Sequence, residues 1–179
     1  MQHWKELLTE LGSVQSFEYP YMREGRRSPD RLAKLIDAHR AQLEGARSAG
    51  HEHVVLIGKS MGGRVGCHLA TQQLVSAVVC LGYPLKGMGA KGKLRDQVLL
   101  ELQVPILFVQ GTRDNLCPLD LLESVRIKMQ CPNDLHVVET GDHSLLATKT
   151  WLKQQQLSQD DVDRRSLTVI EEFLRRHAS

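Results

Sequence analysis

The stretch VVLIGKSMGGRVGCHLA, residues 54–70, decides the fold. Four apolar residues run into a glycine, and then come a lysine, a serine, a methionine and two more glycines, before a series of small and apolar residues. A continuous apolar run is typical of a strand that is buried on both faces, and the series behind the serine predicts a helix. The stretch therefore predicts a strand, a tight turn at Ser60 and a helix from about Gly62 to Leu74.

Ser60 stands in Gly58-Lys59-Ser60-Met61-Gly62, which matches the pattern G-x-S-x-G. Between a strand and a helix, this pattern holds a nucleophilic serine on a strained turn, where side chains in place of Gly58 and Gly62 would collide with the adjoining elements. The turn also puts the Met61 N–H at the start of a helix, where it can donate to a developing oxyanion. The alternative interpretation is a glycine-rich turn with a solvated serine, because a five-residue match also arises by chance.

Strands and helices are expected to alternate along the rest of the chain. The apolar runs 53–58, 76–82, 105–111 and 135–140 predict strands, and VQSFEYPYM (residues 14–22) is a shorter strand candidate. Helices are predicted along Trp4–Leu11, after Ser28-Pro29-Asp30, over 118–130, and after Ser158, where Asp161 gives a capping-box pattern. We therefore expect one α/β domain over residues 1–179, with helices on both faces of a mostly parallel sheet.

Two residues can complete the chemistry that a serine nucleophile needs, namely a base and an acid that orients the base. Asp114 follows the apolar run 105–111, and His143 follows the next run. The carboxyl ends of parallel strands meet at one rim, so both are expected beside Ser60. Each has another interpretation, because Asp114 can begin a turn and His143 can be an exposed loop histidine. Asp142, which adjoins His143, and Asp120, at a predicted helix start, are weaker candidates for the acid.

Composition excludes several classes of protein. The net charge of +2 comes from basic residues scattered among acidic ones, which argues against direct nucleic-acid binding. The opening MQHWKELLTE is not a signal peptide, and no apolar run approaches the roughly 20 residues of a membrane span, so we expect a cytoplasmic or nuclear location. A phosphate-binding P-loop would need glycine where His53 stands. The four cysteines are widely spaced and form no CxxC pair, so we expect buried thiols in a reducing compartment and not disulfides or metal ligands; they are Cys67, Cys80, Cys117 and Cys131. We also expect no cofactor.

The motifs FEYPYM, GKSMGGR, CLGYPLKG, KLRDQVLLEL, VPILFVQGTRDNLCP and GDHSLL identify a resemblance that covers nearly the whole chain. They resemble the α/β-hydrolase-like domain of the testis-expressed hydrolase-like proteins, of the third subunit of the non-specific lethal chromatin complex, and of short plant and bacterial relatives, which look closest. The resemblance implies the α/β-hydrolase fold, with Ser60, Asp114 and His143 at the triad positions. Members also carry an earlier strand ending in a His-Gly-Ala-Gly type turn, whose loop supplies the second oxyanion-hole N–H. In the family this strand precedes the helix that begins here at Trp4, and in the sheet it lies between the strands that correspond to 14–22 and 53–58; we expect this chain to be N-terminally shortened and to lack it.

Two functions remain open at this point. The first is a serine hydrolase that acts on an ester, thioester or amide of a small-molecule or acyl substrate, with activity reduced by an incomplete oxyanion hole. The second is a non-catalytic interaction module that binds a protein partner in a larger assembly, such as a chromatin-associated one. Several basic residues are expected near the rim of the sheet that carries Ser60, where they either favour an acidic substrate or belong to a solvated loop. These residues are Lys59, Lys86, Lys91, Lys93 and Arg95.

Overall fold

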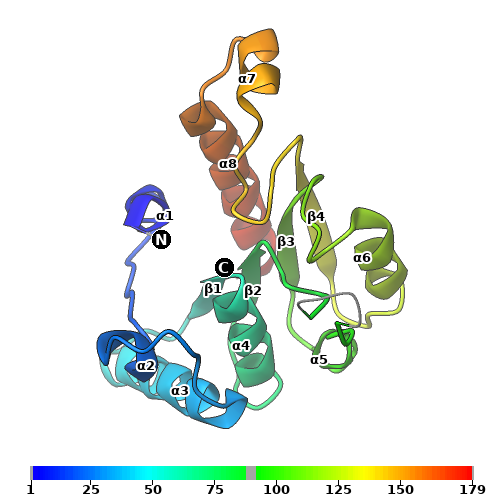
Figure 1. Cartoon of the computed structure of the whole chain (residues 1–179). Helices are drawn as coiled ribbons and strands as arrows, with labels where there is room; N and C mark the ends of the chain where they lie inside the picture. The colour runs from blue at the N-terminus through cyan, green and yellow to red at the C-terminus, as the bar shows by residue number, and fades with distance from the viewer. Residues whose placement is uncertain (1, 88–91, 179) are drawn as a thin grey trace.

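The structure, a computed structural model, describes residues 2–87 and 92–178 (Figure 1). Its sheet consists of four parallel strands in the order β1-β2-β3-β4, so that each strand lies beside the next one in the sequence. The strands are β1 (Val55–Lys59), β2 (Ala77–Leu81), β3 (Ile106–Gly111) and β4 (Asn133–Val138). Four of the predicted strands are thereby confirmed, and all four carboxyl ends lie at the same edge of the sheet.

Helices cover both faces of this sheet (Figure 1). One face packs against α3 (Leu32–Ser48), α4 (Met61–Ala70), α5 (Gln97–Leu100) and α6 (Leu119–Arg126). The other face packs against α1 (Gln2–Leu8) and α8 (Gln159–His177). Alternate residues of β2 face the two sides, with Val78 and Cys80 in the first core and Val79 and Leu81 in the second. Burial on both faces explains why the sequences of the central strands are continuously apolar.

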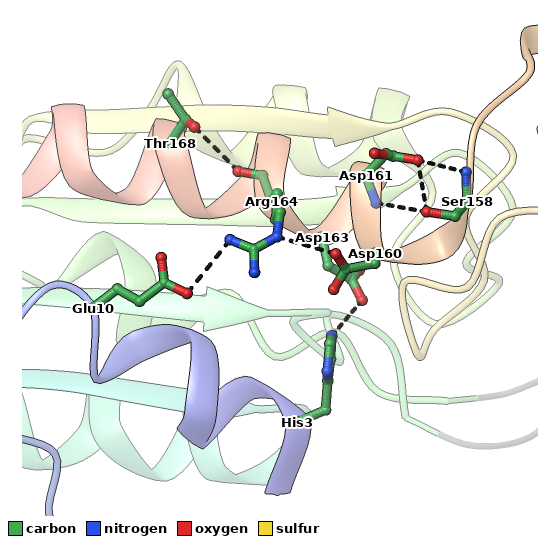
Figure 2. A network of polar contacts seen from close by, with 8 residues as sticks. All are labelled: His3, Glu10, Ser158, Asp160, Asp161, Asp163, Arg164 and Thr168. Carbon is green, nitrogen blue, oxygen red and sulfur yellow. Dashed lines mark hydrogen bonds and ion pairs between the residues drawn. The ribbon is translucent and has the colours of Figure 1, made fainter.

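Polar contacts join the first and last helices of the second face (Figure 2). His3 Nε2 lies 2.9 Å from Asp163 Oδ2, and the carboxylate of Asp163 is almost completely buried. Arg164 Nη1 lies 3.4 Å from Glu10 Oε1, just beyond the end of α1. Apolar side chains of both helices pack beside these contacts. The N-terminal helix is therefore held on the sheet by α8 as well as by the strands.

The start of α8 matches the sequence prediction. The hydroxyl of Ser158 accepts the backbone N–H of Asp161 at 3.1 Å, and the carboxylate of Asp161 accepts the Ser158 N–H at 2.7 Å. This reciprocal pair satisfies two of the N–H groups that a helix start leaves without partners. The sequence did not predict α5 or α7 (Lys149–Gln155), which are both short. No helix within the described residues combines the length and the apolar character that crossing a membrane requires.

The predicted strand over residues 14–22 is wrong. Residues 14–19 have no regular secondary structure, and α2 (Pro20–Arg23) takes up the rest of that segment. The apolar alternation is nevertheless real, because Tyr19 and Tyr21 are buried and Phe17 stacks edge-on against Tyr19 at 5.1 Å between ring centroids. These rings pack beside His39 of α3. The segment therefore covers a helix and does not pair with a strand, and β1 pairs with β2 alone among the described strands.

Two predicted helix boundaries also need correction. Ser28 does not cap α3, whose N-cap is Arg31. The Asp30 carboxylate instead binds Arg26 at 2.8 Å and Lys34 at 3.3 Å, so it bridges the preceding loop to the first turn. At its other end, α3 continues to Ser48, and Gly50, two residues further on, adopts a φ of +89° that ends the helix. The first helix ends at Leu8, before Gly12, and the following residues form single turns.

Candidate active site

Ser60 occupies the sharp turn between β1 and α4. Its φ of 51° and ψ of −119° are uncommon for a residue with a side chain, and such conformations persist only where the surrounding structure imposes them. Close packing imposes this one, because a Cβ on Gly58 would lie 2.3 Å from backbone atoms of Gly62 and Gly63. The predicted reason for Gly62 is wrong, since a Cβ there would meet nothing within 4 Å. The second closely packed glycine is Gly63, whose Cβ would lie 2.8 Å from Gly58 O.

The structure brings Ser60, His143 and Asp114 into one hydrogen-bonded chain. Ser60 Oγ lies 2.7 Å from His143 Nε2, and His143 Nδ1 lies 2.7 Å from Asp114 Oδ2. A carboxylate only accepts hydrogen bonds, so Nδ1–H donates to Asp114 and Nε2 is left to accept the serine hydroxyl. The Asp114 side chain is fully buried and that of His143 is 28% exposed, so the imidazole faces the outside while its acid does not.

The rival acids lie elsewhere. Asp142 Oδ1 accepts the backbone N–H groups of Ser144 at 2.7 Å and Leu146 at 3.0 Å, so it shapes the loop that carries His143. Asp120 lies in the first turn of α6. The loop of His143 also packs closely on the end of β2, where Gly82 has a φ of 68° and a Cβ would lie 2.6 Å from His143 O. This contact fixes the backbone of His143 against the end of β2.

Gln110 is a member of this arrangement that the sequence analysis missed. It lies in β3, is fully buried, and its Nε2 donates to Asp114 Oδ2 at 2.5 Å. Its Oε1 accepts the backbone N–H of Tyr83 at 3.0 Å. The Leu116 N–H donates to the other oxygen of Asp114 at 2.8 Å, so three donors surround this carboxylate. The signal in the sequence is a lone amide inside the apolar run PILFVQG, four residues before Asp114.

Met61 is the first residue of α4, so its N–H has no intrahelical partner and belongs to the positive end of the helix. This position is the one predicted for an oxyanion donor. All four cysteines are buried free thiols, as predicted. Within the part of the chain that the structure describes, no group of three or more His, Cys, Asp or Glu side chains is arranged to hold a metal ion.

Comparison with known proteins agrees with this architecture. The sequence model of the alpha/beta hydrolase domain family matches residues 1–174. A monoacylglycerol lipase from Paleococcus ferrophilus superimposes with a TM-score of 0.69 at 11% identity, over 96% of this chain and 90% of that one. A dienelactone hydrolase from Anabaena variabilis gives a TM-score of 0.65 at 18% identity, over 99% and 79%. An alpha-beta serine hydrolase homologue from Coxiella burnetii gives 0.64 at 16% identity, over 92% and 74%.

These identities are low, so the superpositions concern the fold alone. The family match covers nearly the whole sequence, and the chain therefore belongs to the alpha/beta hydrolase domain family. Its four-stranded parallel sheet with helices on both faces is the α/β-hydrolase fold.

Proposed function

We propose that this member of the alpha/beta hydrolase domain family is a serine hydrolase that cleaves an ester, thioester or amide bond. The observation that carries the proposal is the hydrogen-bonded chain from Ser60 through His143 to the buried Asp114, with 2.7 Å at each step. A serine that only capped a turn would need neither partner at that distance. The strained conformation of Ser60 adds to the argument, because such strain is found where function requires it.

The reaction follows from the acceptor and donor atoms. His143 Nε2 takes the hydroxyl proton of Ser60 as Oγ attacks the substrate carbonyl, and Asp114 stabilises the imidazolium that forms. Collapse of the tetrahedral intermediate expels the alcohol, thiol or amine, which takes the proton from Nε2. His143 then removes a proton from water, which attacks the acyl-serine. Collapse of this second intermediate releases the acid, while Nε2 returns the proton to Ser60 Oγ.

The oxyanion of each tetrahedral intermediate would bind at the Met61 N–H. In this fold the second donor usually comes from a different loop, and we assign no second donor here. Removal of one donor typically costs about 10²–10³ in kcat. We therefore expect slow turnover from this chain, with formation of the acyl-enzyme easier to detect than steady-state hydrolysis.

Labelling with a fluorophosphonate probe tests the proposal directly, because the probe reacts covalently with an activated serine. The wild type is expected to label, and Ser60→Ala is expected to abolish labelling. Ser144→Ala is the matched control, since this serine adjoins His143 but does not bond to its imidazole, and it should label normally. Absence of labelling in wild-type protein that is folded by circular dichroism would refute the proposal and leave the interaction module as the better explanation.

A further inference from the structure

A basic cavity of about 200 Å³ lies between α4 and the start of α5. Three of its lining side chains carry a permanent positive charge, and a histidine and an amide lie beside them. These five residues are Arg64, His68, Lys93, Arg95 and Gln97. No Asp or Glu is among the described residues that line the cavity.

The three permanent cations of this cavity form no ion pair with a carboxylate of the described residues. Among the described residues, no salt bridge involves Arg64, Lys93 or Arg95, whereas six other arginines form one. Burial and the neighbouring charge of Arg95 both lower the pKa of Arg64. The carboxylate of Glu101 accepts a hydrogen bond from Gln97 at 2.9 Å, and its charge acts on His68, whose pKa is nevertheless lowered by burial and by Arg64. Adjacent cations that are partly buried without a carboxylate repel one another, and a bound anion would relieve that repulsion.

Two buried side-chain nitrogen atoms at the cavity also have no hydrogen-bond partner. Arg64 Nε and His68 Nε2 are both buried, and neither forms a hydrogen bond within the described structure. Buried polar atoms are normally satisfied, so such exceptions call for a ligand, an ion or an ordered water. The forked guanidinium group suits the planar or tetrahedral oxygens of a carboxylate or a phosphate.

Both walls of the cavity are attached to the candidate active site. Arg64 follows Ser60 by one helical turn, and its N–H donates to Ser60 O at 3.2 Å. On the other wall, the backbone carbonyl of Arg95 accepts the Tyr83 hydroxyl at 2.9 Å, and Tyr83 directly follows Gly82, which packs on His143. The helical rise places Arg64 roughly 6 Å, and a residue one turn further on roughly 12 Å, from Ser60 along α4.

We infer that this cavity binds an anionic group of the substrate, a carboxylate or a phosphate, that lies several atoms from the reacting carbonyl. The inference rests on the proposed hydrolase function and narrows its substrate class to acyl compounds with a negatively charged group. The inference also indicates which of the basic residues predicted near the rim would contact the substrate. Arg95 and Lys93 line the cavity, Lys86 lies in an isolated β-bridge with Leu94, and Lys91 lies outside the described residues.

Hydrolysis of paired 4-nitrophenyl esters tests the inference. One ester of each pair is a monoester of glutarate, adipate or suberate, and its partner has the free carboxylate blocked as a methyl ester. The wild type is expected to favour the anionic ester at least tenfold in kcat/KM at low ionic strength for one of the three chain lengths. Arg64→Gln and Arg95→Gln should each reduce that preference about tenfold while leaving the neutral ester within twofold. The control Arg165→Gln, at an exposed position of α8, should retain the preference.

Three results would overturn the inference: equal rates for the two esters in the wild type, a preference that survives both substitutions, or equal losses on both esters. Calorimetric titration separates the cavity from the chemistry, because Ser60→Ala protein can bind without reacting. Adipate and inorganic phosphate are titrated separately, and the one that binds identifies the anion. Binding should be lost in the Ser60→Ala/Arg64→Gln protein. If neither anion binds, the inference about the cavity is refuted, even if the fluorophosphonate labels Ser60. If an anion binds but the wild type is not labelled, only the proposed hydrolase function is refuted.

Discussion

Replacement of Gln110 by methionine perturbs the support of the candidate site without touching its reacting atoms. Methionine has a similar length and fits an apolar strand, so the substitution removes two hydrogen bonds while keeping most of the packing. The backbone N–H of Tyr83 loses its acceptor, and the Asp114 carboxylate loses one of its three donors. All of these groups are buried, so water does not replace the lost partners.

The expected loss of stability follows from these two bonds. A buried N–H without a partner costs about 1–3 kcal/mol, and a hydrogen bond to a charged group contributes about 1.5–3 kcal/mol. Burial of the apolar methionine offsets part of the sum, and we expect a net loss of roughly 3 kcal/mol. For a chain of this size, that corresponds to a decrease in Tm of about 6–12 °C.

Urea denaturation followed by circular dichroism measures this loss, and the rate of fluorophosphonate labelling measures its effect on Ser60. Labelling should slow by up to about 100-fold but persist, because His143 and the Leu116 N–H still hold Asp114. Gln154→Met, at an exposed position of α7, is the matched control. A free energy of unfolding within 0.5 kcal/mol of the wild type, together with an unchanged labelling rate, would show that Gln110 supports neither the fold nor Asp114.

Three other predictions follow from particular contacts. Ser60→Gly should be more stable than Ser60→Ala by about 1 kcal/mol in urea denaturation, because glycine tolerates a φ of 51°; the opposite order would show that the turn is unstrained. Burial lowers the pKa of His39 to about 4, so as the pH falls the unfolded chain takes up a proton at this residue before the folded chain does. The free energy of unfolding should therefore decrease by roughly 3 kcal/mol as the pH falls from 6.5 toward 4. His39→Gln should flatten this pH dependence and the exposed control His53→Gln should not; equal slopes in all three proteins would contradict the assignment. A double-mutant cycle of His3→Ala and Asp163→Asn should give a coupling of about 0.5–1 kcal/mol, whereas additive effects would show that the contact between α1 and α8 contributes nothing.

The successful predictions depend on signals that are local in the sequence. A strand buried on both faces is almost continuously apolar, and this is visible in the runs that became β2 and β3, whereas β1 and β4 are only partly buried. The capping box at Ser158 needs only two residues three positions apart. The prediction of a strand over residues 14–22 was wrong because its signal is not specific. Alternation of apolar and polar residues shows that one side of the segment is buried, but it does not show whether a strand or a helix covers that side. The predicted start of α3 was wrong because the Asp30 carboxylate binds two cationic side chains, which compete with a capping role at the helix start.

Local signals in the sequence also explain why the residues Ser60, Asp114 and His143 could be predicted and why Gln110 was missed. Ser60, Asp114 and His143 lie on turns after strands, and a parallel sheet gathers such turns at one edge whatever their distance along the chain. Gln110 lies within a strand, and its acceptor and donor contacts, Tyr83 and Asp114, come from two different loops. The sequence nevertheless predicts such contacts. An amide side chain in a strand that is covered on both faces is buried, and a buried amide is stable only when its polar atoms form hydrogen bonds. A single polar residue inside a continuous apolar strand therefore points to a partner at the adjacent strand ends, and here those ends carry the residues of the candidate site.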